Sequence, residues 1–373
     1  MKIAFILGGS TYEQSLYRVT LDVANELRRR RVDVDCIFWE DPGPLQGNDK
    51  FLPIFGLCKE HRASKLFSKL FTAIFGKHGY YYLFSKLFSR QLKQSLQSAD
   101  YNAVFYHGQS CIPMHAGIGR NYVIVHSCKY ENFISRHRGL KKPFYRWLYR
   151  KIYSGKKLLT VSDDVASDMV QKIGARPQSI KTIHNGFDFE RLRQEMSQPA
   201  PAGLPDSYLM AAGRPDRTKR FDVLLRAYAK TRKDYPLVIF GDGKLLGKLK
   251  TLADQLSISE HVIFAGFCPD ILPAFSHARL YVSSSDVEGL PTVIVESLVA
   301  GTPVVATDAG GSNELLAGEL SRWIVPRGDI DALAKAIDDI LLAPPVVSKE
   351  NVRFLDYRLI ADQYQRYAEQ INE

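Results

Sequence analysis

Cysteine is sparse in this chain of 373 residues, and long apolar runs are missing. The five cysteines are odd in number and no two of them form a Cys-x-x-Cys pair, which argues against a disulfide framework or a zinc site. Scattered thiols of this kind are typical of a reducing compartment. No apolar stretch approaches the ~18 residues of a membrane-spanning helix, so we expect no segment that crosses a bilayer.

The glycine pattern of dinucleotide-binding enzymes is also missing. Such a site needs Gly-x-Gly-x-x-Gly directly after the first strand and an acidic residue after the second. Here Glu40 follows the second expected strand, but Gly8 and Gly9 are not followed by the remaining glycines. The sequence therefore excludes a dehydrogenase of this type.

Two Asp-x-Asp pairs have a spacing that can indicate a metal-binding site. Asp33 and Asp35 fall in an expected strand, whereas Asp329 and Asp331 fall at an expected helix start. We interpret both pairs as structural, with Asp329 as a helix N-cap, and we expect no metal site.

Charge is unevenly distributed along the chain. Residues 1–200 hold 31 Lys+Arg against 17 Asp+Glu, whereas residues 201–373 hold 19 against 23. A basic half favours a polyanionic partner, such as nucleic acid, anionic lipid or a phosphorylated substrate, although a well-solvated basic surface is the simpler interpretation.

Short apolar runs alternate with helical patterns, which predicts an α/β fold with parallel sheets covered by helices. Each half has its own set of expected strands. They are residues 3–7, 32–38, 103–107, 122–126, 158–161 and 180–183 in the first half, and 208–212, 237–240, 262–265, 280–283, 304–307 and 323–325 in the second. The segment QPAPAGLP at 198–205 is rich in proline and predicts an interdomain linker. We therefore expect domains at 1–198 and 205–350, followed by a helix at 351–373 that crosses back to the first domain.

Two basic stretches of the first half are interleaved with large apolar side chains. At 62–97 the tetrapeptide SKLF occurs three times, and its Leu and Phe residues recur at helical spacing beside lysines. At 136–157 nine Lys+Arg and no acids are mixed with Phe, Tyr and Trp. A basic amphipathic helix can lie in a membrane interface, or it can pack its stripe on a protein core. Basic-aromatic mixtures also suit single-stranded nucleic acid, but the chain has no recognised nucleic-acid module.

The strongest functional signal is SSSDVEGLPTVIVESLVAGTPVVATD at 283–308, which predicts strand, loop, helix, glycine turn and strand. Pro291 suits the first helical position, and Glu288 and Glu296 then flank the helix start. The free amides and positive dipole end of such a helix bind anions. A nucleotide-sugar matches this order, with its diphosphate on the amides of Leu290 and Thr292. Glu296 would then accept the ribose hydroxyls and Glu288 would reach the sugar. An acidic helix start stabilised by its own dipole is the competing interpretation.

The motif EGLPTVIVE…GTPVVATDAGG resembles the hallmark of the family-four retaining glycosyltransferases. AGRPDRTKRFDVLLRAY at 212–228, IFGDGKL at 239–245, VIFAGF at 262–267, IHNGFD at 183–188 and LGGSTYEQSLYRV at 7–19 are similar to further segments of that family. His184 stands where the family usually has proline. The resemblance implies the GT-B fold, in which two Rossmann-like domains face each other across a cleft.

Several site residues follow from this resemblance. Arg214 and Lys219 match the basic pair that holds the donor diphosphate, although a surface ion pair between Arg214 and Asp216 is the alternative. Gly241 and Phe267 match the strand ends that frame the nucleotide base, and Gly9 and Ser10 match the loop that faces the donor phosphates. His126, at the end of a strand, would lie against the donor sugar, whereas a structural histidine is the alternative there and more so at His107.

The function that the resemblance implies is transfer of a hexose or N-acetylhexosamine from a nucleotide-diphosphate sugar, with UDP as the expected nucleotide. The reaction would retain the anomeric configuration by front-face attack, without a metal or another cofactor. Lys219, Arg214, Glu288 and His126 are the expected catalytic residues. We expect a glycan or glycolipid acceptor, with or without phosphate groups, from bacterial lipopolysaccharide or surface-polysaccharide assembly. The expected location is cytoplasmic, peripheral on an anionic inner membrane surface. The alternatives are a GT-B-type sugar-nucleotide epimerase, a non-catalytic binder, and a basic nucleic-acid-binding protein.

Overall fold

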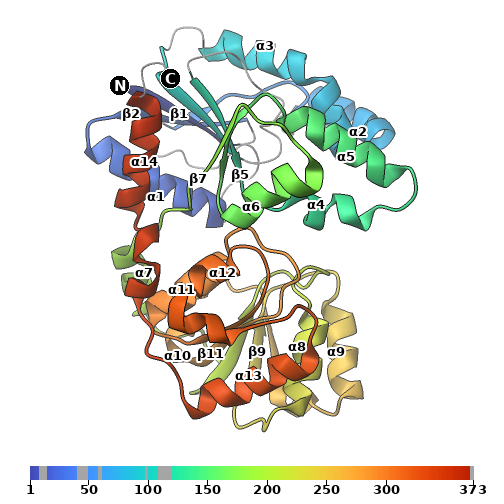
Figure 1. Ribbon diagram of the computed structural model, residues 1–373, viewed down its shortest axis with the longest axis vertical. Helices are drawn as coiled ribbons and strands as arrows, with labels where there is room; N and C mark the ends of the chain where they lie inside the picture. Colours follow the sequence, from blue (N-terminus) through green and yellow to red (C-terminus); the bar gives the residue numbers. More distant parts are fainter. Residues whose placement is uncertain (8–14, 40–48, 58–60, 97–99, 108–119, 370–373) are drawn as a thin grey trace. The chain divides into compact units, whose positions relative to one another are not determined.

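The structure is a computed structural model of the chain that describes residues 1–373 except 8–14, 40–48, 58–60, 97–99, 108–119 and 370–373 (Figure 1). The predicted sites Gly9 and Ser10 lie outside the described residues, as do Glu40, Cys58 and Cys111. The chain divides into two compact units, one formed by Met1–Phe187 with Leu355–Glu373 and the other by Asp188–Phe354. Each unit is an α/β domain with its own parallel sheet.

The described part of the first unit contains one seven-stranded parallel sheet in the order β3-β2-β1-β4-β5-β6-β7. The strands are β1 (Lys2–Leu7), β2 (Asp33–Phe38), β3 (Lys50–Phe51), β4 (Ala103–His107), β5 (Arg120–Val125), β6 (Lys157–Thr160) and β7 (Ser179–Thr182). Most of them are near-continuous apolar runs because helices cover both faces of a parallel sheet. All six strands expected in this half are confirmed within two residues, and the short edge strand β3 is additional.

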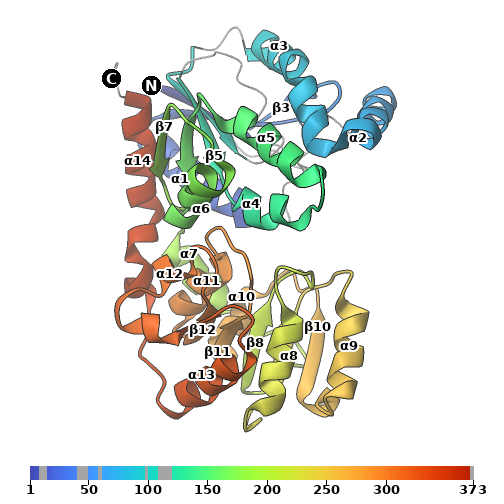
Figure 2. The ribbon, with the colours of Figure 1, turned by 45° about the vertical axis from the view of Figure 1, so that its right-hand side comes forward.

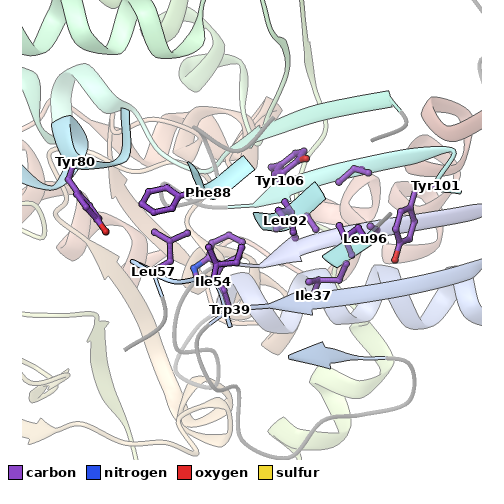
Figure 3. Packing of buried hydrophobic residues seen from close by; sticks show 13 residues of the cluster. Ile37, Trp39, Ile54, Leu57, Tyr80, Phe88, Leu92, Leu96, Tyr101 and Tyr106 are labelled. Carbon is purple, nitrogen blue, oxygen red and sulfur yellow. The ribbon is translucent and has the colours of Figure 1, made fainter. Parts of the chain in front are cut away.

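The helices of the first unit are α1 (Ser15–Arg29), α2 (Arg62–Leu83), α3 (Ser85–Leu96), α4 (Lys129–Asn132), α5 (Lys141–Tyr153), α6 (Asp163–Ser167) and α14 (Tyr357–Glu369). Helix α2 is kinked at Gly76, where φ is 69° and ψ is 161°. Helix α3 places Phe88, Leu92 and Leu96, spaced four residues apart, in one buried cluster with residues of the sheet (Figure 3). Tyr80 of α2 joins the same core and donates a hydrogen bond to the carbonyl of Gly56 at 2.7 Å.

The C-terminal helix α14 belongs to the first unit, although the whole second unit precedes it in sequence. It packs along α1, and the Arg29 guanidinium donates to the Tyr357 hydroxyl at 3.1 Å. Tyr364 lies edge-on to Phe5 and Phe105 of the sheet, at ring-centroid distances of 5.3 and 4.8 Å. The buried aromatic face of α14 therefore completes the core of this unit.

The described second unit contains a six-stranded parallel sheet in the order β10-β9-β8-β11-β12-β13. Its strands are β8 (Tyr208–Ala212), β9 (Leu237–Phe240), β10 (Val262–Gly266), β11 (Ala278–Ser283), β12 (Val304–Thr307) and β13 (Ile324–Val325), all six of which the sequence predicts. Its helices are α7 (Phe189–Met196), α8 (Phe221–Lys230), α9 (Leu246–Gln255), α10 (Leu272–His277), α11 (Thr292–Ala300), α12 (Ser312–Leu315) and α13 (Ile330–Leu342) (Figure 2).

The division between the units falls at Phe187 and Asp188, earlier in the chain than the proline-rich segment at 198–205. Helix α7 lies between these two points and packs on α10 and α11 of the second unit. Its residues Phe189, Leu192 and Met196 are buried. The apolar stripe of α7 therefore places it in the second unit, and the prolines follow it on that unit's surface.

Both Asp-x-Asp pairs contribute contacts to the fold, and the predicted N-cap at Asp329 is confirmed. Asp35 is buried, accepts a hydrogen bond from the Tyr101 hydroxyl and forms an ion pair with Lys50 at 2.6 Å. Asp329 caps α13 by accepting from the amide of Ala332 at 2.9 Å. Within the described ranges no group of His, Cys, Asp and Glu has the arrangement of a metal site. No described helix is long and apolar enough to cross a membrane.

Candidate active site

The predicted residues of the second unit converge on one edge of its sheet. Because parallel strands end at the same edge, the segments that follow β8, β9, β10 and β11 are neighbours there. Arg214 and Lys219 follow β8, whereas Gly241, Phe267 and Glu288 follow β9, β10 and β11. The topology therefore gathers side chains that are far apart in sequence at the edge where open α/β sheets bind ligands.

Helix α11 begins at this edge with an uncapped N-terminus. Its N-cap residue is Pro291, with φ −72° and ψ 104°, and the proline side chain provides no capping hydrogen bond. Pro291 therefore lies one position earlier than the sequence predicts, because its extended ψ ends the loop and helical geometry starts at Thr292. The first backbone amides of a helix and its dipole together favour an anion at this point.

Lys219 and Glu288 form an ion pair beside this helix start. The distance from Lys219 Nζ to Glu288 Oε1 is 2.7 Å, and the two side chains are 21% and 14% exposed. The Ser285 hydroxyl donates to the same carboxylate oxygen at 2.6 Å. A partly desolvated cation is thus held where it can share its charge between a carboxylate and an added anion.

A network of hydrogen bonds fixes the two loops that supply this pair. Asp216 accepts from the amides of Thr218 and Lys219, at 2.8 and 3.4 Å, and the Ser284 hydroxyl donates to the carbonyl of Lys219 at 2.7 Å. The amide of Asp286 donates to the carbonyl of Thr218 at 2.8 Å. The loop after β8 and the loop after β11 are therefore tied together through their backbones.

Arg220 completes this network in a left-handed conformation, with φ 47° and ψ 42° at the N-cap of α8. Its guanidinium reaches both oxygens of Asp286, at 3.0 and 3.2 Å, and also pairs with Asp222. A non-glycine residue is strained in this region of backbone conformation. The ion pairs to Asp286 and Asp222 hold Arg220 in it. Sequence reasoning did not identify Arg220 or Asp286 as site residues, although both lie within the predicted site motifs.

Two glycines let the backbone pack closely behind the site. Gly310 has φ +57°, and a Cβ built on it would lie 2.2 Å from the carbonyl oxygen of Glu288. Gly241 has φ +126°, and its Cβ would lie 2.0 Å from the carbonyl oxygen of Gly213. Gly311 donates its amide to the carbonyl of Gly289 at 3.0 Å. The Gly310-Gly311 pair is therefore a backbone platform under the Glu288 loop, and the motif DAGG was the signal for it.

The remaining predicted donor residues differ in exposure. Glu296 is half-buried on α11, four residues after the half-buried Thr292, so the two share one face of the helix. Leu290 is buried, whereas the ring of Phe267 is 69% exposed at the end of β10. Arg214 is exposed and, across the described part of the chain, forms no ion pair. The alternative of a pair with Asp216 is not observed.

A cavity of about 650 Å³ lies close to these loops but is a separate feature. It is lined by residues of α8 and α9, among them Phe221, Leu249 and Leu252, and by Arg220 and Asp286 of the loop network. Lys219, Glu288 and Glu296 are not part of its lining.

In the first unit, the ends of β4 and β5 bring His107 and His126 together. Their Nδ1 and Nε2 atoms are 3.2 Å apart, and the rings are stacked at a centroid distance of 5.2 Å. Burial lowers the pKa of His107 to about 3. Burial, His107 and Lys129 lower the pKa of His126 well below its ordinary value, so both rings are neutral at pH 7. The role of His126 at the donor sugar stays a prediction.

Two family descriptions together account for nearly the whole chain. Residues 17–191 match Glycosyltransferase Family 4, and residues 193–355 match Glycosyl transferases group 1. The chain belongs to the glycosyltransferases. The expected family is therefore confirmed, and the two sheets are the two Rossmann-like domains of a GT-B glycosyltransferase.

Two curated relatives of this glycosyltransferase have names from bacterial glycan assembly. One is the N-acetylgalactosamine-N,N'-diacetylbacillosaminyl-diphospho-undecaprenol 4-alpha-N-acetylgalactosaminyltransferase of Campylobacter jejuni, 32% identical over 149 residues that cover 40% of each chain. Another is the lipopolysaccharide core biosynthesis glycosyltransferase LpsE of Rhizobium meliloti, 34% identical over 149 residues, 40% of this chain and 42% of the relative. The match thus spans about two fifths of either relative's length.

A solved structure extends the likeness of fold to the whole glycosyltransferase. HepE of Anabaena, crystallised in complex with UDP and glucose, superimposes with a TM-score of 0.68. The match covers 98% of both chains at 18% sequence identity. At that identity the likeness shows the common fold.

Proposed function

We propose that this glycosyltransferase moves a hexose or N-acetylhexosamine from a nucleotide-diphosphate sugar, with UDP as the expected nucleotide, to a glycan acceptor. The observation that carries the proposal is the uncapped start of α11 with the Lys219–Glu288 ion pair beside it. An anion site next to a carboxylate that can bind hydroxyl groups suits a sugar diphosphate better than a free phosphate.

The donor would lie along the loop and the first turn of α11. Its diphosphate would accept from the amides of Leu290 and Thr292 and from Arg214 and Lys219. Glu296 would accept hydrogen bonds from the ribose hydroxyls. The exposed ring of Phe267 and the backbone at Gly241 would frame the base, and Glu288 would hold hydroxyl groups of the sugar.

This arrangement supports catalysis through charge on the leaving group. As the bond from the anomeric carbon to the diphosphate breaks, negative charge grows on the phosphate oxygen. Arg214 and Lys219 would stabilise that charge more strongly in the transition state than in the ground state. In the retaining reaction that we propose, the acceptor hydroxyl attacks the same face and the leaving diphosphate takes its proton. His126, being neutral, can hydrogen-bond a sugar hydroxyl or the backbone at the reacting centre.

The acceptor that we propose is a lipid-linked glycan of bacterial lipopolysaccharide or surface-polysaccharide assembly. Support comes from the relatives, one named for an undecaprenol-linked acceptor and the other for the lipopolysaccharide core. The basic first half of the chain would favour acceptors that contain phosphate. On this basis we place the enzyme at the inner surface of the cytoplasmic membrane.

The test is calorimetric titration of the full chain with a panel of nucleotide-sugars, followed by turnover with the ligand that binds. Lys219→Met removes a charged hydrogen bond worth roughly 1.5–3 kcal/mol, so the dissociation constant should rise about 10- to 150-fold. Glu296→Gln should weaken binding as well. Lys230→Met is the matched control, because Lys230 pairs with Asp331 on the same unit but both side chains are exposed.

The outcome separates the alternatives. A transferase forms product only when an acceptor is present, with the anomeric configuration of the donor retained. Conversion of the donor without an acceptor would identify an epimerase, and binding without conversion would identify a binder. Unchanged donor affinity in Lys219→Met and Glu296→Gln would refute the site.

A further inference from the structure

The apolar stripe of helix α2 is divided between the protein core and solvent. Phe67 and Phe71 turn inward and pack on Phe84, at ring-centroid distances of 5.1 and 4.8 Å, against the core that Figure 3 shows. Leu66, Leu70 and Ile74 remain 69%, 56% and 62% exposed. These three lie four residues apart and form one row along the helix. Packing on the core therefore explains only half of the stripe.

Helix α5, which packs beside α2, also carries exposed aromatic side chains. Phe144 and Trp147 are each about half exposed, and the rings of Trp147 and Tyr82 are 6.5 Å apart. The hydroxyl of Tyr149 and Nε2 of His78 are 3.0 Å apart, which joins the two helices on their buried side. Figures 1 and 2 both show α2 and α5 side by side. We call Leu66, Leu70, Ile74, Phe144 and Trp147 the α2–α5 face.

The two segments that carry this face contain positive charge only. Neither residues 62–97 nor residues 136–157 contain an Asp or Glu. Lys65, Lys69, Lys141 and Arg150 are exposed, and they form no ion pair with any residue that the structure describes. The cations that border the apolar row are therefore complementary in charge to an anionic surface.

An anionic lipid surface fits this combination better than the other partners. Leucine and isoleucine rows enter the acyl boundary of a bilayer, tryptophan favours the headgroup region, and lysines contact the phosphates. Single-stranded nucleic acid would use the aromatic rings and the charges, but it offers nothing to the aliphatic row. Exposed contiguous apolar side chains of this kind mark interaction sites on soluble proteins.

We propose that the α2–α5 face is the surface by which the first unit lies on anionic phospholipid, with the aliphatic row of α2 inserted between headgroups. The proposal deepens the proposed function, because a lipid-linked acceptor would be reached at that surface. It also gives a role to the exposed residues of the SKLF repeats, which are not part of the donor site. The binding needs both apolar insertion and charge.

The test is flotation of the full chain with vesicles of phosphatidylcholine alone or with about 30% phosphatidylglycerol, at low and high salt. The variant Leu70→Gln/Ile74→Gln removes two exposed apolar side chains, and Lys65→Gln/Lys69→Gln removes two charges. The matched control is Leu342→Gln/Val346→Gln, which changes two exposed apolar residues of the second unit. Unfolding temperature and nucleotide-sugar affinity in solution are measured on every preparation.

We expect phosphatidylglycerol to raise vesicle binding at least tenfold over phosphatidylcholine, and salt of about 0.5 M to reverse it. Both face variants should lose at least tenfold in vesicle affinity, and the control should bind as the parent does. Vesicle binding that survives in both face variants would overturn the proposal. Binding to a labelled oligonucleotide without binding to vesicles would also overturn it. Donor affinity distinguishes the two proposals, since it can fail without any loss of vesicle binding.

Discussion

Replacing Gly310 by alanine tests whether backbone packing under Glu288 sets the geometry of the donor site. The new Cβ would lie 2.2 Å from the carbonyl oxygen of Glu288 and 2.8 Å from its carbonyl carbon. Carbon and oxygen atoms that are not bonded approach to about 3.3 Å, so the Glu288 loop must move by about 1 Å. A misplacement of that size costs on the order of 100-fold in a reaction that depends on orientation.

Gly318→Ala is the matched control for this substitution. Gly318 also has a positive φ, +64°, but a Cβ on it would meet no atom within 4 Å. It therefore isolates the cost of placing alanine in the left-handed region, about 1–2 kcal/mol. For a domain of this size that cost lowers the unfolding temperature by about 2–8 °C.

The assay combines thermal unfolding with sugar transfer at saturating donor. We expect Gly318→Ala to lose stability but keep its turnover. Gly310→Ala should lose more stability than the control and about two orders of magnitude in turnover. If the two variants behave alike in both measurements, the platform does not position Glu288 and the reasoning is refuted.

Three further predictions concern single side chains. Glu288→Gln should leave UDP binding unchanged or tighter, because Lys219 is released from its ion pair, whereas turnover of the nucleotide-sugar should fall. Calorimetry and product analysis measure the two effects, and weaker UDP binding would contradict the prediction. Burial and nearby positive charge lower the pKa of His78 to about 4, below its ordinary value, so stability is complete above pH ~6.5 and falls toward pH 4, by at most about 1.4 kcal/mol per pH unit. His78→Gln should flatten that loss in acid-unfolding curves, and an unchanged pH profile would contradict it. Asp286→Asn should cost no more than about 1 kcal/mol, because it and Arg220 are a third exposed, yet it should weaken donor affinity; unaltered affinity would show that the pair does not position the loops.

Strands and the donor motif could be predicted from the sequence because both are local in origin. An apolar run such as that of β9 is buried on both faces of a parallel sheet, so its bounds follow from composition. The helix after Glu288 follows from proline and glycine before an apolar run, although it starts at Thr292 and not at Pro291. The cap at Asp329 is likewise a contact over three residues.

The interpretations that the sequence left open depend on contacts between distant residues. Arg214 next to Asp216 could have been an ion pair, but Asp216 is used by the amides that follow it. The stripe of α2 has one helical periodicity, yet Phe67 is packed on the core and Leu66 is exposed. No periodicity distinguishes neighbours on the same stripe, because the partner surface decides which of them is covered.

By itself the sequence determined the two parallel sheets, the helix that follows Glu288, and the charge difference between the halves. Those properties depend on residues that are close together in the sequence, so the sequence alone is enough to predict them. Tertiary structure alone decided that Lys219 is paired with Glu288, that Gly310 lies against its backbone, and that α7 packs within the second unit. Each of these joins segments separated by other elements, and their approach depends on how the intervening strands and helices pack.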